Sequence, residues 1–301
     1  MIKIYFVAKF MRFLMRHNDN KFKKSLEYKP VTPFKVFSYL DDKDKMHKFN
    51  LYEAQKTVNK GTVIDVHGGA WCYGDKDLND LYCSYFALNG FNVLSPSYRL
   101  ISKTNLIGML KDLFSFFTYI KEHEKELKID LSKVMLIGDS AGANLVNTFN
   151  IINNSKELQE KFNFKHVDLK IDLLVLEHPC IFYDYLGQTG NKEKLTKLTC
   201  QGLFHKKDYK DDLSYKLLNA PKIYDFYNCK NKTIIVGSKK DVYYPQTQLI
   251  IEELNKRNID FIYKEYDDEV HVFEVINPYS KNSIEFNKFV LESFINLKEE
   301  I

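Results

Sequence analysis

The stretch from Val134 to Gly142 reads VMLIGDSAG, an apolar run that ends in a turn with a serine at its centre. The apolar residues Val134–Ile137 predict a buried strand. Ser140 then lies between glycines at positions 138 and 142, the G-x-S-x-G spacing of a tight turn from a strand into a helix. A serine hydroxyl is a good nucleophile only when the backbone presents it to a base and supplies N–H donors for the developing oxyanion. The pattern therefore predicts that Ser140 is a catalytic nucleophile.

The composition suits one large α/β domain over residues 1–301. Hydrophobic residues make up 45% of the chain and aromatic residues 15%, enough to bury a sheet between helices. The net charge is +4, and no segment combines clustered Lys or Arg with spaced aromatics, which excludes nucleic acid as an expected partner. Five cysteines without C-x-x-C spacing predict reduced thiols and a cytoplasmic protein, with no zinc site.

Predicted strands alternate with predicted helices along most of the chain. Residues 34–40 and 46–53 flank a polar turn and predict a β-hairpin. Further strands are expected at residues 62–66, 91–95, 133–137, 171–176, 233–236 and 259–265. Helices are expected at residues 78–89, 106–128, 143–152, 246–257 and 283–298. This alternation implies a mostly parallel sheet with helices on both faces. The aromatic-rich stretch between residues 176 and 233 is expected to be an irregular insertion folded over the site.

The N-terminal segment predicts an amphipathic basic helix. Its apolar face consists of Phe6, Phe10, Phe13 and Leu14, and its basic face of Lys9, Arg12 and Arg16. The basic residues interrupt the apolar start, so we expect no signal sequence, and no apolar run elsewhere is long enough for a spanning helix. Two interpretations stay open: the helix packs over the body of the protein, or it contacts a membrane surface.

A small-residue loop follows the first predicted parallel strand. Residues 67–71 read His-Gly-Gly-Ala-Trp directly after the buried run Val63–Val66. Small side chains there would let backbone N–H groups face a developing negative oxygen. Because the loop also precedes Ser140 in the chain, we expect it to supply oxyanion donors, with Gly68, Gly69 and Ala70 as candidates.

Asp241 and His271 complete a candidate catalytic set. Asp241 follows the predicted strand 233–236, and His271 lies between the strand 259–265 and the last helix. Carboxyl ends of parallel strands meet at one edge of a sheet, so these side chains are expected to converge on Ser140. In such a triad His271 takes the proton from Ser140, and Asp241 holds the imidazole in the required tautomer.

Other residues compete for these roles. Asp267 and Asp268 lie too close to His271 in sequence to come from a separate strand end. His178 follows the predicted strand 171–176 and is well placed to reach a site, yet it precedes the acid candidate. His67 is expected to brace the oxyanion loop rather than act as a base. Cys72 lacks the strand-to-helix turn that a nucleophile needs.

Between about residues 60 and 150 the chain resembles the hormone-sensitive-lipase-like branch of the α/β-hydrolase fold, which includes bacterial carboxylesterases and lipases. Residues 67–71 are similar to the H-G-G-G-[FWY] block of that family, 98–100 to its Y-R-L block, and 138–145 to its nucleophile block. Two blocks differ, since Ile101-Ser102 replaces A-P and residues 238–241 replace D-x-L-x-D. Ala70 replaces the third glycine, which is acceptable if only an N–H is needed there and φ is negative.

The resemblance implies a fold, an oxyanion hole and a reaction. The fold is a mostly parallel central sheet flanked by helices, with cap elements at about residues 1–30 and 181–228. The hole uses the N–H groups of Gly69, Ala70 and Ala141, with Gly68 in the same candidate set. The reaction is hydrolysis of carboxylic esters with small or medium acyl chains through an acyl-enzyme, without metal or organic cofactor. A homodimer is an open expectation. The alternatives are amide or formamide hydrolysis, as in arylformamidases and deacetylases, and a catalytically silent binding module.

Overall fold

A mostly parallel sheet forms the centre of the molecule, as the sequence predicted. The computed structural model describes residues 9–10, 12–13, 15–17, 31–56, 60–181, 191–218 and 222–297. Within them lies an 8-stranded sheet of order β1-β2-β4-β3-β5-β6-β7-β8. The strands are β1 Phe34–Ser38, β2 Lys48–Tyr52, β3 Thr62–Val66, β4 Asn92–Pro96, β5 Val134–Asp139, β6 Leu173–Glu177, β7 Lys232–Ser238 and β8 Ile262–Tyr266. The hairpin β1–β2 and the pair β2–β4 are antiparallel, and the other neighbouring pairs are parallel.

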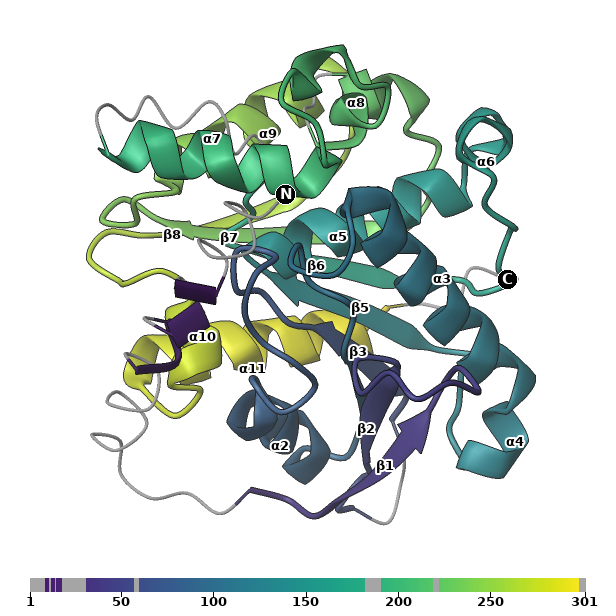
Figure 1. Cartoon of the computed structure of the whole chain (residues 1–301). Helices are drawn as coiled ribbons and strands as arrows, with labels where there is room; N and C mark the ends of the chain where they lie inside the picture. The colour runs from purple at the N-terminus through teal and green to yellow at the C-terminus, as the bar shows by residue number, and fades with distance from the viewer. Residues whose placement is uncertain are drawn as a thin grey trace.

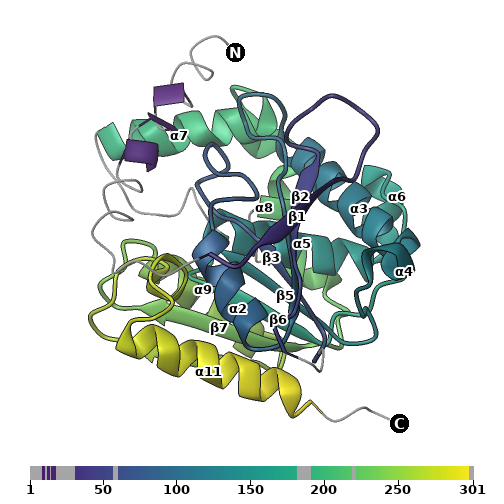
Figure 2. The same cartoon turned by 90° about the horizontal axis from the view of Figure 1, so that it is seen from below.

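Helices cover both faces of the sheet. Figures 1 and 2 show α3, α5 and α9 on one face and α2, α10 and α11 on the other. The helices are α2 Asp80–Leu88, α3 Leu106–Glu122, α4 Glu124–Leu127, α5 Ala141–Asn153, α6 Lys156–Phe162, α7 Asn191–Phe204, α8 Tyr215–Leu218, α9 Tyr244–Lys256, α10 Phe273–Ile276 and α11 Lys281–Ile295, with short 3-10 helices η2 Tyr209–Asp211 and η3 Lys222–Phe226. This arrangement confirms the expected fold class.

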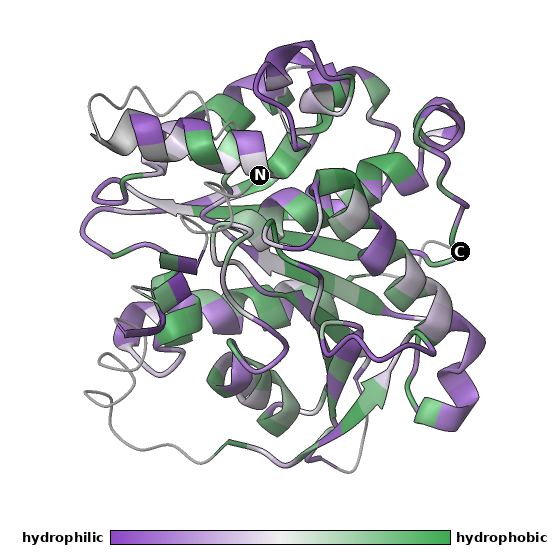
Figure 3. Ribbon diagram, viewed as in Figure 1, coloured by the Kyte–Doolittle hydropathy of each residue, from purple (hydrophilic) through white to green (hydrophobic). Residues whose placement is uncertain are grey.

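The strands bury both of their faces, which explains their continuous apolar sequences. Successive side chains of a strand point to opposite faces, so each strand contributes to two cores. In β5, for example, Leu136 packs in one core, while Met135 and Ile137 pack in the other. Figure 3 accordingly shows the central strands as mainly hydrophobic and the outer helical surfaces as mixed. The two covered faces hold the carboxyl ends of β3, β5, β6 and β7 in a fixed relation, and the candidate site lies there.

Two expected elements differ from the structure. The helix predicted over residues 106–128 breaks at His123, which leaves the helical conformation with φ −110° and ψ 18°, while its N–H still donates to the Tyr119 carbonyl and its ring Nδ1 lies 2.9 Å from the same oxygen. The stretch after β6, expected to be irregular, contains the 14-residue helix α7. Thr196, Cys200 and Leu203 are buried along one side of α7, so a helical face exists there.

The described N-terminal residues are helical, as the sequence predicted, and two residues of the predicted apolar face are exposed. Phe10 and Phe13 are 60% and 67% exposed, whereas Met15, on another side, packs against the larger core. The predicted partners Phe6 and Leu14 lie outside the described residues. Phe10 and Phe13 are therefore largely in solvent, and both interpretations of this helix stay predictions. In the described part of the chain, helices fall short of the length and apolarity needed to cross a bilayer.

Candidate active site

Ser140 occupies a strained turn between β5 and α5. Its backbone has φ 51° and ψ −113°, a conformation that side chains other than glycine rarely adopt. Two hydrogen bonds fix the turn to the end of β6: the Ser140 N–H donates to the Glu177 carbonyl at 2.8 Å, and the Cys180 N–H donates to the Ser140 carbonyl at 3.2 Å. Strain of this kind persists only where neighbours hold it, and it is common at nucleophiles.

The two glycines around Ser140 are required by close contacts. A Cβ on Gly138 would lie 2.6 Å from the Gly142 carbonyl, and a Cβ on Gly142 would lie 2.0 Å from the carbonyl oxygen of Val66. Both separations are far below van der Waals contact. The turn from β5 through Ser140 into α5, here called the elbow, is thus packed directly against the carboxyl end of β3, where the small-residue loop begins.

The small-residue loop, residues 67–71, has a backbone N–H that is already hydrogen-bonded and residues with positive φ. The Gly68 N–H donates to Asp139 Oδ1 at 2.8 Å, and a Cβ on Gly68 would lie 2.3 Å from Asp139 Oδ2. Gly68 is therefore corrected from oxyanion donor to structural anchor, because its N–H is already used. Gly69 and Ala70 have φ 97° and 51°, so the expectation of a negative φ at Ala70 is also wrong. The Ala141 N–H lies in the first turn of α5, where N–H groups lack an intrahelical acceptor.

Asp139 connects the elbow to a buried polar network. The Asn79 side chain donates to Asp139 Oδ1 at 2.9 Å and to Asp65 Oδ2 at 3.1 Å. Burial raises the pKa of Asp65 to about 8, with the charge of Asp139 adding to the effect. Burial also raises the pKa of Asp139 to about 6, against the hydrogen bonds from Asn79 and Gly68 and the charge of His271. Asn79 thus explains how a carboxyl group is accommodated inside β3.

His67 braces the same loop. Its ring Nδ1 lies 2.9 Å from the Gly68 carbonyl oxygen, and the ring stacks on Tyr98 with centroids 4.5 Å apart. The Tyr98 hydroxyl donates to the His67 carbonyl at 2.8 Å. Burial lowers the pKa of His67 to about 4, so this imidazole is neutral at neutral pH. These contacts suit a bracing role, with no free nitrogen exposed to solvent.

Asp241 and His271 meet at the carboxyl edge of the sheet. Asp241 lies just after β7 and His271 after β8, and Asp241 Oδ2 is 2.7 Å from His271 Nδ1. The Tyr243 N–H fixes Asp241 Oδ1 at 2.9 Å. Burial would raise the pKa of Asp241, but hydrogen bonds from His178 and His271 outweigh it and hold that pKa well below its usual value. The ring of His271 lies 5.5 Å, centroid to centroid, from that of His178, which directly follows Glu177, and the Glu177 carbonyl accepts from the Ser140 N–H.

The competing carboxylates point elsewhere. Asp267 is 84% exposed and pairs with Lys239 at 2.7 Å, and Asp268 is 85% exposed and pairs with Lys240 at 2.8 Å. Neither pair involves His271. The arrangement brings Asp241 and His271 together and leaves both rivals in solvent.

The sequence did not predict a second histidine on Asp241. His178 Nδ1 lies 2.6 Å from Asp241 Oδ2, the same oxygen that contacts His271, and His178 Nε2 lies 3.3 Å from Glu274 Oε2. The side chains of His178 and Glu274 are fully buried. His178 follows β6, the strand beside β7, and that position at a strand end was the available signal.

The ring nitrogens of His178 and His271 and the carboxylate of Asp241 lie within 4.8 Å of one another, a spacing that a metal ion could bridge. However, the two Nδ1–Oδ2 distances of 2.6 and 2.7 Å are hydrogen-bond lengths. Ligand atoms around a tetrahedral zinc ion would be about 3.3 Å apart. The geometry therefore fits a hydrogen-bonded chain better than a metal-ligand set.

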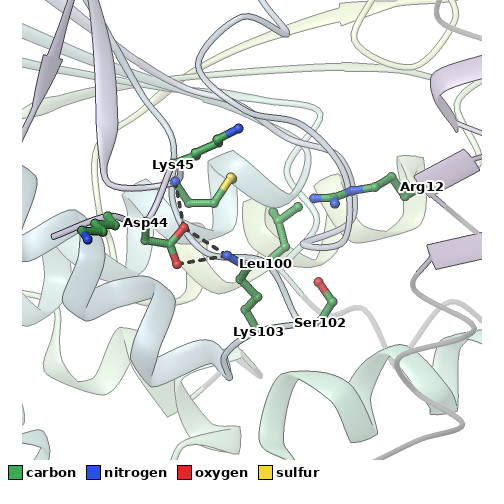
Figure 4. Close-up of a pocket in the computed structure, with 8 residues that line it drawn as sticks. Arg12, Asp44, Lys45, Leu100, Ser102 and Lys103 are labelled. Carbon is green, nitrogen blue, oxygen red and sulfur yellow. Dashed lines mark hydrogen bonds and ion pairs between the residues drawn. The ribbon is translucent and has the colours of Figure 1, made fainter.

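A basic hollow of about 530 Å³ lies beside the loop after β4 and the N-terminal helix (Figure 4). It is lined by Arg12, Lys43, Asp44, Lys45, Met46, Leu100, Ser102 and Lys103. Lys103 Nζ contacts both carboxylate oxygens of Asp44 at 3.1 Å, which neutralises one of the four cations. None of the candidate catalytic or oxyanion residues lines this hollow.

Comparisons with known proteins agree with this architecture. A sequence model of the alpha/beta hydrolase fold family matches residues 63–275. An arylesterase of Saccharolobus solfataricus is 24% identical over 71% of this chain and 61% of its own length. Lipase 2 of a Moraxella strain is 32% identical over 29% of this chain and 21% of its own length. The match thus spans less than two thirds of either of these relatives.

Solved structures match over nearly the whole chain. Esterase B from Lactobacillus rhamnosis HN001 superposes with a TM-score of 0.88 at 25% identity, covering 98% of this chain and 96% of that one. An esterase from Pyrobaculum calidifontis has a TM-score of 0.74 at 17% identity, covering 96% of this chain and 93% of that one, a likeness in fold. The resemblance drawn from the sequence blocks is confirmed, and the chain belongs to the alpha/beta hydrolase fold family.

Proposed function

We propose that this protein hydrolyses carboxylic esters through a covalent acyl-enzyme, with Ser140 as nucleophile. The observation that carries the proposal is the 2.7 Å contact between Asp241 and His271 at the strand ends beside the strained Ser140 turn. A neutral imidazole that donates Nδ1–H to Asp241 has an unprotonated Nε2, the atom that must accept the serine proton.

The reaction then follows in two steps. Ser140 Oγ attacks the ester carbonyl while its proton passes to His271 Nε2, and the C–O bond to the leaving alcohol breaks as His271 returns that proton. Water, activated by His271, then hydrolyses the acyl-serine and restores the enzyme. The N–H groups of Gly69, Ala70 and Ala141 are proposed to bind the oxyanion, and one such donor typically contributes about 10²–10³ in rate.

Names of related proteins support an ester substrate. The relatives include the arylesterase and a probable carboxylesterase 5 of Arabidopsis thaliana, which is 25% identical over 77% of this chain. Esterase B of Lactobacillus rhamnosis has been solved inhibited by a tributyrin phosphonate, at 25% identity and a TM-score of 0.89. A four-carbon acyl group in that ligand supports the small-to-medium acyl range expected from the sequence.

The cap and the cellular setting complete the proposal. We propose that residues 1–30 and 181–228 cover the site; the described helices of the second segment are α7, η2, α8 and η3. Exposed Phe10 and Phe13 support a peripheral membrane contact through the N-terminal helix. The five free cysteines support a cytoplasmic location. A homodimer is a further prediction, to be measured by light scattering.

Initial rates on p-nitrophenyl acetate, butyrate, octanoate and palmitate, beside N-formyl and N-acetyl aryl amides, test the proposal. We expect turnover to be greatest on the acetate or butyrate and to be lost in Ser140→Ala. A preference for palmitate would make the enzyme lipase-like and favour the membrane contact. Faster cleavage of the amides would replace ester by amide chemistry, and ester turnover that survives Ser140→Ala would overturn the assignment of the nucleophile.

A further inference from the structure

A buried imidazole and a buried carboxylate lie behind the candidate triad acid. His178 reaches Asp241 Oδ2 with Nδ1 at 2.6 Å and approaches Glu274 Oε2 with Nε2 at 3.3 Å. The same Asp241 oxygen is 2.7 Å from His271 Nδ1. One carboxylate oxygen therefore lies between two histidine rings, whose centroids are 5.5 Å apart and nearly perpendicular.

We propose that His178 and Glu274 form a buried imidazolium–carboxylate pair that positions Asp241 and weakens its attraction for the proton on His271. This inference rests on the proposed function, because it concerns the base of that same reaction. Neither residue touches the reacting atoms, so both are positioning residues rather than catalytic ones.

The surroundings of His178 determine its charge. The titratable groups that face it are Asp241 from the loop after β7, Glu274 from α10 and His271 from the loop before α10. Its chain neighbour in β6, Glu177, is also affected by Glu274 and accepts a hydrogen bond from Tyr82 of α2. Burial disfavours the charged ring, but Glu274 and Asp241 outweigh burial and raise the pKa of His178 to about 9. The ring is then an imidazolium at neutral pH.

Glu177 does not cancel this charge. Burial and the charge of Glu274 raise the pKa of Glu177 well above its usual value, so that side chain is neutral at pH 7. Asp241 and Glu274 remain as the two negative partners of His178. The backbone supports the same geometry: His178 adopts φ 45°, and its N–H donates to the Val236 carbonyl of β7 at 3.0 Å.

A cation beside Asp241 affects His271 in a predictable direction. In an ordinary triad the aspartate stabilises an imidazolium without competition. Here a second imidazolium shares the oxygen, and its positive charge opposes protonation of His271. The centroids of the two rings are 5.5 Å apart, close enough for this repulsion to act at an effective dielectric constant of about 20, and the negative charge of Glu274, on the far side of His178, offsets part of it.

The test is the pH dependence of kcat/KM for p-nitrophenyl acetate in the full-length protein and two variants. His178→Gln removes the charge while leaving an amide that can still donate to Asp241. His123→Gln is the matched control, because His123 lies at the α3–α4 break, away from the site. We expect the acidic limb of the profile to move to higher pH in His178→Gln, because the opposing positive charge is removed, and to stay in place in His123→Gln. A merely structural role for His178 would lower the rate without moving the limb, and that result would overturn the proposal.

If His178→Gln fails to fold, or if the wild type hydrolyses no ester, the protonation state of His178 can be measured directly. Nitrogen NMR of histidine-labelled wild-type protein reports the protonation of each ring directly. We expect one buried ring to remain doubly protonated at pH 7, losing its proton only near pH 9. A neutral His178 at pH 7 would refute the pair. Absence of ester turnover and of fluorophosphonate labelling would instead refute the proposed function, independently of this NMR result.

Discussion

The backbone strain at Ser140 predicts that glycine is more stable than alanine at this position. Ser140→Ala keeps a Cβ at φ 51° and ψ −113°, whereas Ser140→Gly removes it. Residues in sparsely populated conformations cost about 1–3 kcal/mol. Glycine loses about 0.5–1 kcal/mol through the greater entropy of its unfolded chain. The difference leaves Ser140→Gly more stable than Ser140→Ala by about 1 kcal/mol.

Thermal unfolding followed by circular dichroism measures this difference. For a chain of this size 1 kcal/mol corresponds to roughly 2 °C in Tm. The matched pair is Ser84→Gly and Ser84→Ala, because Ser84 lies inside helix α2, where glycine should be the less stable by about 0.5–1 kcal/mol. The order of glycine and alanine should thus reverse between the two positions. If Ser140→Gly were less stable than Ser140→Ala by as much as at position 84, the turn would carry no strain.

Three further predictions address the acid, the buried network and the elbow. Asp241→Asn should lower kcat by about 10⁴, because its histidine partner takes the wrong tautomer. Asp268→Asn, which changes an exposed ion pair, should leave kcat near the wild-type value. If Asp268→Asn lowered the rate of ester hydrolysis more than Asp241→Asn, the acid would be misassigned. Burial raises the pKa of Asp65 from 3.8 to about 8. Between these two pH values the unfolded chain loses this proton before the native state does, so the free energy of unfolding falls as pH rises. Asp65→Asn should therefore raise Tm at pH 8 by more than at pH 4.5, and an equal gain at both pH values would contradict this. Gly142→Ala would place a Cβ 2.0 Å from the Val66 carbonyl oxygen. We therefore expect the variant to lose activity and to be destabilised by more than about 2 kcal/mol in urea unfolding. A variant as stable and active as the wild type would show that the turn can relax.

Local sequence was sufficient to predict the strands and the nucleophile turn. Val134–Ile137 are apolar because both faces of β5 are covered, and Gly138 reflects a contact within the turn itself, with Gly142, whereas Gly142 is required by the packing of the turn against Val66 at the end of β3. The pairing of Asp241 with His271 could also be predicted, since parallel strands bring their carboxyl ends together. These features depend on short-range geometry and on topology.

Other features depend on contacts between distant residues. Asp139 accepts a hydrogen bond from the Gly68 N–H because the end of β5 lies beside the loop after β3. No local sequence pattern predicts this contact. The buried side of α7 includes Thr196 and Thr199, whose weak hydrophobicity obscures the helical period in the sequence. His178 was noted at a strand end, but only the structure places it on the same oxygen as His271.

Whether Ser140 is the nucleophile can be tested directly by reacting the protein with a fluorophosphonate and determining the modified residue by peptide mass spectrometry. We predict one adduct per chain, on the peptide containing Ser140; it should be absent in Ser140→Ala and form much more slowly in Asp241→Asn. An adduct on another residue, or equal labelling of Ser140→Ala, would contradict the claim that this elbow, with its Asp241–His271 pair, is the catalytic centre.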